Sequence, residues 1–216
     1  MDSSEKQNKK DVADHRGHIY GLLALMYRQE VTPELLSQVK DPRFLGVFAD
    51  LDIDGIEALL QSSEEKLIED LAVEYTRLFL GPGKHISPLE SIHHHRENGD
   101  WGTFWGSSAV DVKKFIEATG LNYQPDYKGF PDHISVEFEL MEALIQREVK
   151  AWSEHDERTA IRCLEVQQKF LENHIGRWVP SFCEKVIKEA RLPFYRAVAE
   201  LTQRFINFEM QEINGN

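Results

Sequence analysis

Apolar residues recur every three or four positions along most of this chain. Between residues 11 and 29, for example, Ile19, Leu22, Leu23 and Met26 follow this spacing, which places them on one face of an α-helix. No stretch alternates regularly between apolar and polar residues, as a half-buried β-strand does. We therefore expect an all-α fold, with the 216 residues organised as a single helical bundle-like domain.

Local signals indicate where several of these helices begin and end. Thr32 and Pro33 predict an N-cap followed by proline in the first turn. The sequence Ser-Ser-Glu-Glu at residues 62–65 has the pattern of a capping box. Gly-Pro-Gly at residues 81–83 predicts the end of that helix, because glycine accepts the left-handed terminal conformation and proline cannot continue a helix. Gly120 predicts the end of another helix, which begins at residues 107–108.

Three apolar faces dominate the second half of the chain and predict its core. Residues 136–152 carry apolar side chains on nearly all sides, which indicates a helix buried all round. The other two faces comprise Ile161, Leu164, Leu171, Ile175, Trp178, Phe182 and Val186, and then Phe194, Val198, Leu201, Phe205 and Phe208.

Two stretches lack a helical period. Residues 81–106 are rich in Gly, Pro, His and Trp and predict a long structured loop, a kind of segment that often carries function. Residues 122–132 predict a hinge between an N-terminal lobe over residues 11–121 and a C-terminal lobe over residues 132–210.

The charge of the chain limits its partners. It has 37 acidic and 25 basic residues, a formal net charge of -12. Such a charge repels nucleic acid and anionic lipid and favours cationic partners. The same charge also serves simply to keep a protein in solution, and composition alone favours that interpretation.

The cysteines and the N-terminal sequence indicate the compartment. Cys163 and Cys183 form no CxxC motif and have no metal-ligand partner at a useful spacing, which favours two packed thiols in a reducing compartment. The first residues contain no apolar signal core, and no window approaches eighteen apolar residues. We therefore expect a cytoplasmic protein with no stable membrane insertion.

No catalytic motif is present. The segment at residues 81–84 lacks P-loop spacing and follows a helix rather than a strand. Glu90 and His93 form one Glu-x-x-His unit, next to His94 and His95, but di-iron bundles need two such units on helices. We interpret the three histidines as incidental surface residues and expect no metal, no cofactor and no enzyme. The alternative is a helical metal-dependent enzyme that uses Glu90, His93, His95 and His133.

Asp132 and His133 stand at the start of the long helix over residues 136–152. One interpretation is catalytic, with Asp132 orienting His133 as a base. The favoured interpretation is structural, with the Asp132 carboxylate capping the free N–H groups of that helix.

The aromatic residues around the long loop also allow two interpretations. Trp101, Phe104 and Trp105 lie in the loop, and Tyr75 and Phe79 lie just before it. They are either core residues of the bundle, which is the narrowly favoured interpretation, or the lining of a groove for an apolar peptide.

Four groups of residues, taken together, resemble the redox-enzyme maturation chaperones that include the TorD, DmsD and NarJ groups. They run in the family's order over roughly two thirds of the chain, from Leu67 to Phe208. They are residues 74–83 followed by Pro88 and Ser91; residues 131–134 with Glu137 and Phe138; residues 170–174 with Trp178 and Phe182; and Phe194, Tyr195 and Leu201.

The resemblance implies an all-helical TorD-like fold and a chaperone. Members of the family bind the twin-arginine signal peptide of a molybdopterin-dependent oxidoreductase, or its apo-form, and hold back export until the cofactor is inserted. A twin-arginine peptide is cationic and then apolar, so an acidic protein with an aromatic groove complements both parts. Some members exchange helical lobes, which implies a monomer or a domain-swapped homodimer. The remaining alternative is a general protein-binding adaptor.

The expected peptide-binding groove combines family positions with Trp101, which we infer from composition alone. Tyr75, Phe79 and Trp101 would contact the apolar segment, and Asp132 would pair with an arginine. The whole set is Tyr75, Leu78, Phe79, Gly81, Pro82, Pro88, Ser91, Trp101, Asp132 and His133.

Overall fold

The computed structural model describes residues 3–41, 51, 53–81, 83–96, 99, 102–121 and 129–214. These residues form helices and no strand, and their only extended pairing is an isolated antiparallel bridge between Leu89 and His133. The all-α expectation is confirmed. A search of the described helices finds none with the length and hydropathy needed to cross a membrane.

The chain divides into two compact units, each made of two segments distant in sequence. Unit 1 comprises Met1–Ala24 and Leu89–Arg177, and unit 2 comprises Leu25–Pro88 and Trp178–Asn216. The predicted lobes, residues 11–121 and 132–210, are continuous along the chain and differ from these units. They stay a prediction, and so does the hinge near residues 122–132, of which residues 122–128 lie outside the described part.

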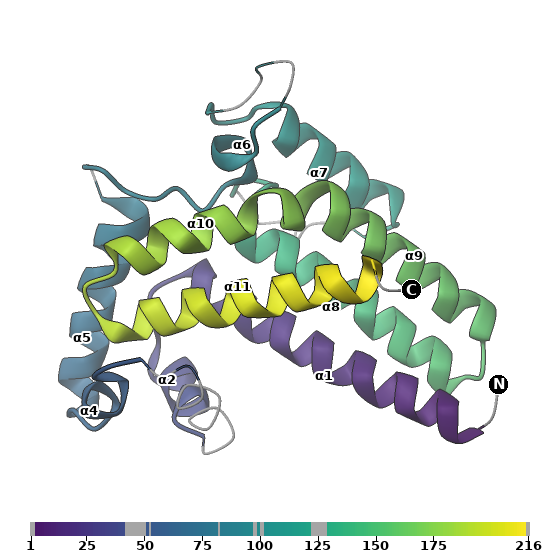
Figure 1. Cartoon of the computed structure of the whole chain (residues 1–216), viewed down its shortest axis with the longest axis horizontal. Coiled ribbons are helices and arrows are strands. Elements are labelled where there is room, and N and C mark those ends of the chain that lie inside the picture. Colours follow the sequence, from purple (N-terminus) through teal and green to yellow (C-terminus); the bar gives the residue numbers. More distant parts are fainter. Residues whose placement is uncertain are drawn as a thin grey trace. The chain divides into compact units, whose positions relative to one another are not determined.

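Unit 1 is centred on a helical hairpin. Helices α8 and α9 run antiparallel and are joined by a short turn (Figure 1). The side chain of Asp156 ends that turn by accepting a hydrogen bond from the amide of Thr159 at 3.1 Å. The helices of this unit are the first part of α1 (Ser3–Arg28), α6 (Glu90–His93), α7 (Ser107–Ala118), α8 (Ile134–Ser153), α9 (Glu157–Phe170) and η2 (Leu171–Ile175).

Helix α8 is buried on nearly all sides, as its composition predicts. The ring of Phe138 is fully buried and packs edge-on against Tyr20 of α1, with 5.7 Å between the ring centroids. One of the buried carboxylates on α8 is paired with two side chains. The Glu148 carboxylate accepts hydrogen bonds from Trp152 Nε1 at 3.0 Å and from Gln167 Nε2 at 2.9 Å. Burial of each large apolar side chain contributes about 1.5–3 kcal/mol.

Unit 2 contains the remaining helices and an aromatic core. The Glu74 carboxylate ties two of them together, because it pairs with Arg77 at 2.7 Å and accepts from the amide of Arg191 at 2.6 Å, just before α11. The helices of unit 2 are the end of α1, α2 (Pro33–Val39), α4 (Ile56–Leu60), α5 (Glu64–Tyr75), η1 (Thr76–Leu80), nearly all of α10 (Gly176–Glu189) and α11 (Pro193–Asn214).

The helix ends lie where the local sequence signals predict them, but only some of them have the predicted capping hydrogen bond or backbone conformation. The Thr32 side chain accepts from the amide of Leu35, and Gly120 ends α7 in the left-handed region with φ +72°. Helix α5 begins at Glu64 as predicted, but Ser63 makes no side-chain capping bond. Gly81 ends the next segment in an extended conformation, φ -61° and ψ 156°, and not in the left-handed one we expected.

Two π-helical turns interrupt the α-helical regularity. Segment η1 follows α5 directly, and segment η2 joins α9 to α10. A π turn bonds residue i to i+5 and so rotates the residues after it relative to those before. The predicted stripe of residues 161–186 is therefore wrong at its start, where Ile161 and Leu164 are 45% and 36% exposed. Phe208 of the last stripe is also exposed.

Candidate functional site

Two motifs that lie far apart in sequence meet in unit 1. The amide of Ser91 donates a 2.8 Å hydrogen bond to Oδ2 of Asp132, 41 residues later. The amide of Glu90 donates to the carbonyl of Asp132 at 2.9 Å, next to the bridge between Leu89 and His133. The long loop is thereby fixed to the start of α8.

Asp132 has a different structural role from the one we expected. Its carboxylate accepts from Ser91 at the start of α6, so the prediction that it caps α8 is wrong. The side chain is fully buried, and this burial raises the pKa of Asp132, although hydrogen bonds from Ser91 act in the opposite direction. A sequence pattern predicts capping only between residues that are close along the chain. It cannot reveal that the backbone amide of a distant residue, here Ser91, will donate to the carboxylate.

His133 is the N-cap of α8. Its Nδ1 accepts a hydrogen bond from the amide of Ser135 at 3.2 Å and lies 2.8 Å from the Ser135 hydroxyl. A ring nitrogen that accepts from an amide carries no proton, so the imidazole is held in the tautomer with hydrogen on Nε2. The half-buried ring is therefore oriented by its own helix.

A buried carboxylate flanked by two imidazoles lies beside this junction. Glu90 is fully buried, and its Oε1 is 2.6 Å from Nδ1 of His94. Its Oε2 is 2.8 Å from Nδ1 of His174, which the π turn η2 carries. Burial alone would raise the pKa of Glu90, but hydrogen bonds and electrostatic interactions with His174 and His94 outweigh it and lower the pKa to about 2. Glu90 is therefore an anion at neutral pH.

This network corrects our interpretation of the histidine triplet. His93 is buried and His94 is half-buried against Glu90, so these two are not incidental surface residues; His95 is exposed. Across the described part of the chain, no three His, Cys, Asp or Glu side chains are arranged to hold a metal ion. Cys163 and Cys183 are both free thiols, and Cys183 is buried.

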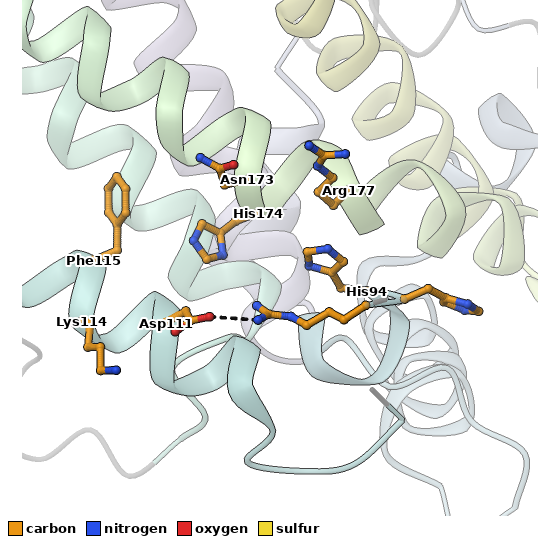
Figure 2. Close-up of a pocket in the computed structure, with 9 residues that line it drawn as sticks. His94, Asp111, Lys114, Phe115, Asn173, His174 and Arg177 are labelled. Carbon is orange, nitrogen blue, oxygen red and sulfur yellow. Dashed lines mark hydrogen bonds and ion pairs between the residues drawn. The ribbon is translucent and has the colours of Figure 1, made fainter. Parts of the chain in front are cut away.

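A pocket of about 850 Å³ opens above His94 and His174 (Figure 2). His174 is fixed there by stacking on Phe170, with 4.8 Å between the ring centroids, and by an edge contact to Phe115 at 6.0 Å. The described residues that line the pocket are His94, His95, Arg96, Asp111, Lys114, Phe115, Asn173, His174 and Arg177.

Two aromatic residues expected in the peptide groove, Tyr75 and Phe79, lie in the core of unit 2. Tyr75 and Phe79 are each 3% exposed, and Leu78 is 1% exposed. The Tyr75 hydroxyl donates to the carbonyl of Tyr27 at 2.9 Å, and burial raises the pKa of Tyr75 to about 12. The Phe79 ring stacks on Phe182 with 6.1 Å between centroids. These side chains are held as core residues in this structure.

The other predicted groove residues are spread over both units. Gly81 is half-buried and Pro88 is buried, both in unit 2, whereas Ser91 is buried in unit 1. Pro82 and Trp101 lie outside the described residues. The structure thus brings Ser91, Asp132 and His133 together in unit 1, and Tyr75, Leu78 and Phe79 together in unit 2.

Two aromatic residues of the long loop are on the surface. Phe104 and Trp105 are 57% and 60% exposed, and both rings pack on Phe130, at 5.6 and 5.2 Å between centroids. The favoured core interpretation is therefore wrong for these two, although it is correct for Tyr75 and Phe79.

Sequence reasoning missed the pairing of Glu90 with His94 and His174. The spacing of Glu90 and His94, four residues apart, was one signal, because such residues lie on the same face of a helix. His174 lies in a family motif, but its distance of 84 residues from Glu90 left no local signal that the two would meet.

Comparison with known proteins gives consistent results in sequence and in structure. The family described as nitrate reductase delta subunit matches residues 49–184. The chaperone protein TorD of Psychrobacter sp. (strain PRwf-1) is 24% identical over 227 residues, which cover 99% of this chain and 97% of that protein. The chaperone protein TorD of Vibrio atlanticus (strain LGP32) is 26% identical over 221 residues, which cover 97% of this chain and 99% of that protein.

A solved structure shares the fold. It is described as a putative redox enzyme maturation protein from Archaeoglobus fulgidus, and it superposes with a TM-score of 0.50 at 20% sequence identity, over 90% of this chain and 93% of that one. At this identity the likeness concerns the arrangement of the helices alone.

Proposed function

This chain belongs to the nitrate reductase delta subunit family, and from that premise we propose that it binds the twin-arginine signal peptide, the apo-form, or both, of a molybdopterin-dependent oxidoreductase. Its relatives are chaperone proteins, which confirms the expectation of a maturation chaperone and not an enzyme. The proposed setting is the cytoplasm, where binding would assist cofactor insertion and delay export until the client is mature.

The observation that carries this proposal is the similarity to TorD chaperones along nearly the whole chain. The negative charge of this chain supports the signal peptide, or leader, as the part of the client that is bound. The chain carries a formal net charge of -12, whereas a twin-arginine leader begins with cationic residues and continues with apolar ones. Opposite charge accelerates the encounter and disfavours wrong partners.

The junction of Ser91, Asp132 and His133 is the proposed arginine-binding part of the site. The Asp132 carboxylate is buried, and its Oδ2 accepts a hydrogen bond from the backbone amide of Ser91. Burial raises the pKa of Asp132, and an arginine brought close to this carboxylate would stabilise its charged form. Binding would therefore require the loop at Ser91 to move.

Titration calorimetry with twin-arginine leader peptides from several molybdoenzymes tests the proposal. We expect one leader to bind with a Kd of about 1 μM or below and to lose binding when its two arginines are replaced by alanine. A parallel pull-down with a client that lacks its leader separates leader binding from binding of the apo-protein. No heat with any leader, together with no capture of any apo-client, would contradict the proposal.

Oligomeric state is a separate part of the proposal, which allows a monomer or a homodimer that exchanges helical lobes. Domain exchange needs a connecting segment that changes conformation, and the predicted hinge near residues 122–132 includes the exposed Gly129. Light scattering after size-exclusion chromatography distinguishes the two states. A dimer whose proportion changes when Gly129 is replaced by alanine would support the exchange.

A further inference from the structure

The pocket above His94 and His174 is unusually basic for this chain. Among the described residues that line it, the permanent cations are Arg96, Lys114 and Arg177, and the one carboxylate is that of Asp111. The chain as a whole carries a net charge of -12. The pocket therefore concentrates positive charge on a protein whose overall charge is strongly negative.

Much of this positive charge is not neutralised by the protein itself. Asp111 is engaged with Arg96 at 2.9 Å, and Figure 2 marks this contact. Arg177 donates from Nε to the carbonyl of Glu172 at 2.8 Å, which is a neutral partner. Across the described residues, neither Arg177 nor Lys114 forms an ion pair with a carboxylate. Within the described part of the chain, these two exposed cations therefore have no carboxylate that would compete with an external anion.

The buried Glu90 does not change this balance. Its carboxylate is already hydrogen-bonded to His94 and His174, which themselves line the pocket, and it lies 3.9 Å from Arg96, which is also paired with Asp111. These bonds fix the two rings in place. The floor of the pocket is therefore rigid and polar, and its rim is cationic.

A second pocket continues the same surface. It has a volume of about 570 Å³ and shares Phe115 with the first pocket. Apolar side chains, including Leu144 and Val166, line its interior. Its described lining contains no carboxylate but three cations, Arg147, Arg162 and Lys169, and all three are exposed.

The two pockets together fit a particular kind of ligand. An apolar groove with a cationic rim binds a segment that carries both apolar and acidic side chains. A twin-arginine leader does not have this chemistry, because its arginines would face Lys114 and Arg177. A small anion would pair with the cations of the first pocket but would leave the apolar groove empty.

We propose that this surface of unit 1, here called the cationic face and defined by Lys114, Arg177, Phe115, Arg147, Arg162 and Lys169, docks an acidic segment with interspersed apolar residues on a partner polypeptide. The partner's carboxylates pair with Lys114 and Arg177, and its apolar side chains enter the groove beside Phe115. The residues that line the two pockets do not include Ser91, Asp132 or His133, so the inference goes beyond recognition of the leader.

Adjacent lysines on α7 provide a matched test. Lys114 lines the pocket, whereas its neighbour Lys113 is exposed, is absent from the lining and lies 4.0 Å from Glu117. Lys114→Glu and Lys113→Glu change the net charge equally, and both positions are exposed, so neither variant should unfold the protein. The probe is a fluorescein-labelled peptide of alternating glutamate and leucine, measured by fluorescence anisotropy with the full-length protein.

We expect saturable binding that weakens as salt is raised. Lys114→Glu and Arg162→Glu should each raise the Kd by about tenfold, the equivalent of about 1.4 kcal/mol, while Lys113→Glu should leave it within about twofold. Equal loss in the two lysine variants would overturn the proposal, because it would indicate only long-range repulsion. Saturable binding of pyrophosphate without any binding of the peptide would overturn it as well.

The outcome is independent of the proposed function. Leader binding is measured with a cationic peptide and depends on other residues, so Lys114→Glu should not weaken it. If Lys114→Glu abolished binding of the leader and of the acidic peptide alike, the two sites would not be separate and the inference would fail.

Discussion

Oε2 of Glu90 lies 2.8 Å from Nδ1 of His174, 84 residues further along the chain, and both side chains are buried. The π turn η2 carries His174, and the short helix α6 carries Glu90. Because Oε1 of the same carboxylate meets His94 at the end of α6, one anion holds α6 against η2 within unit 1. The contact therefore connects the stability of the unit with the shape of the pocket above it.

Replacement of Glu90 by glutamine should destabilise the protein strongly. The amide removes the negative charge and offers one acceptor oxygen to two imidazole donors. Loss of one partner of a buried ionic network costs about 3–5 kcal/mol. The measurement is chemical denaturation at neutral pH. Glu154→Gln is the control, because Glu154 is exposed and its one ion pair within the described residues is with Lys150 at 3.8 Å. The effect of this substitution should stay below about 0.5 kcal/mol. A similar loss in both variants would contradict the role given to Glu90.

The same carboxylate should give stability a distinct pH dependence. The pKa of Glu90 in the fold is about 2, below its ordinary value of 4.5. A depressed folded-state pKa means that ionised Glu90 stabilises the protein fully at pH values above 4.5 and progressively less as the pH falls toward 2. The free energy of unfolding should therefore fall over this window. The fall should be shallower in Glu90→Gln, and identical slopes in the two proteins would exclude Glu90 as the cause.

Two substitutions at Asp132 should separate its structural role from ligand binding. Asp132→Ala leaves the buried amide of Ser91 without its acceptor, at a cost of about 1–3 kcal/mol. Asp132→Asn retains an acceptor oxygen and should cost less than about 1 kcal/mol. If the carboxylate pairs with an arginine of the leader, both variants should weaken leader binding by about tenfold or more. Thermal denaturation and calorimetry measure the two effects, and unchanged affinity in Asp132→Asn would remove Asp132 from the proposed site.

Phe79 should act through the core of unit 2. Its ring packs against Tyr75 at 5.1 Å and Tyr195 at 6.0 Å between centroids, and it is 3% exposed. Phe79→Ala should therefore lower the free energy of unfolding by about 3–5 kcal/mol, as large-to-small substitutions in a core do. Leu80→Ala is the matched control, since Leu80 is the next residue but is 62% exposed and should cost less than about 0.5 kcal/mol.

A milder substitution tests whether Phe79 also contacts the leader. Phe79→Leu preserves an apolar side chain of similar volume and should keep most of the stability. If the leader binds without opening unit 2, its affinity for Phe79→Leu should equal that of the wild type. A large loss of affinity in a folded Phe79→Leu protein would instead support the predicted groove contact.

Structural roles that depend only on neighbours within one or two helical turns were predictable from the sequence. Thr32 caps α2 and Gly120 ends α7, because the geometry of a helix end depends on a few neighbouring residues. The burial of α8 was also predictable, since its apolar side chains cover nearly all of its circumference. The Gly-Pro-Gly signal located the end of η1 correctly but not the conformation of Gly81, because several backbone geometries can end a helix.

The candidate site was predictable only in its parts. Ser91, Asp132 and His133 were chosen from motifs, and the structure does bring them together. Their roles differ from the expectation, because the amide that the Asp132 carboxylate accepts from belongs to another segment. The periodicity of residues 161–186 failed for a similar reason, since nothing in a regular stripe indicates the π turn that shifts it.

The sequence by itself determined that this protein is helical, that it is strongly acidic, and which family it resembles. These properties depend on residue identity and on spacing over a few positions. Only the tertiary structure decided that Glu90 would meet His174, that Tyr75 and Phe79 would be core residues, and that cations from separate helices would gather around Phe115. Such contacts depend on how distant segments pack, and their energies are set by burial and by distance in space, neither of which local sequence specifies.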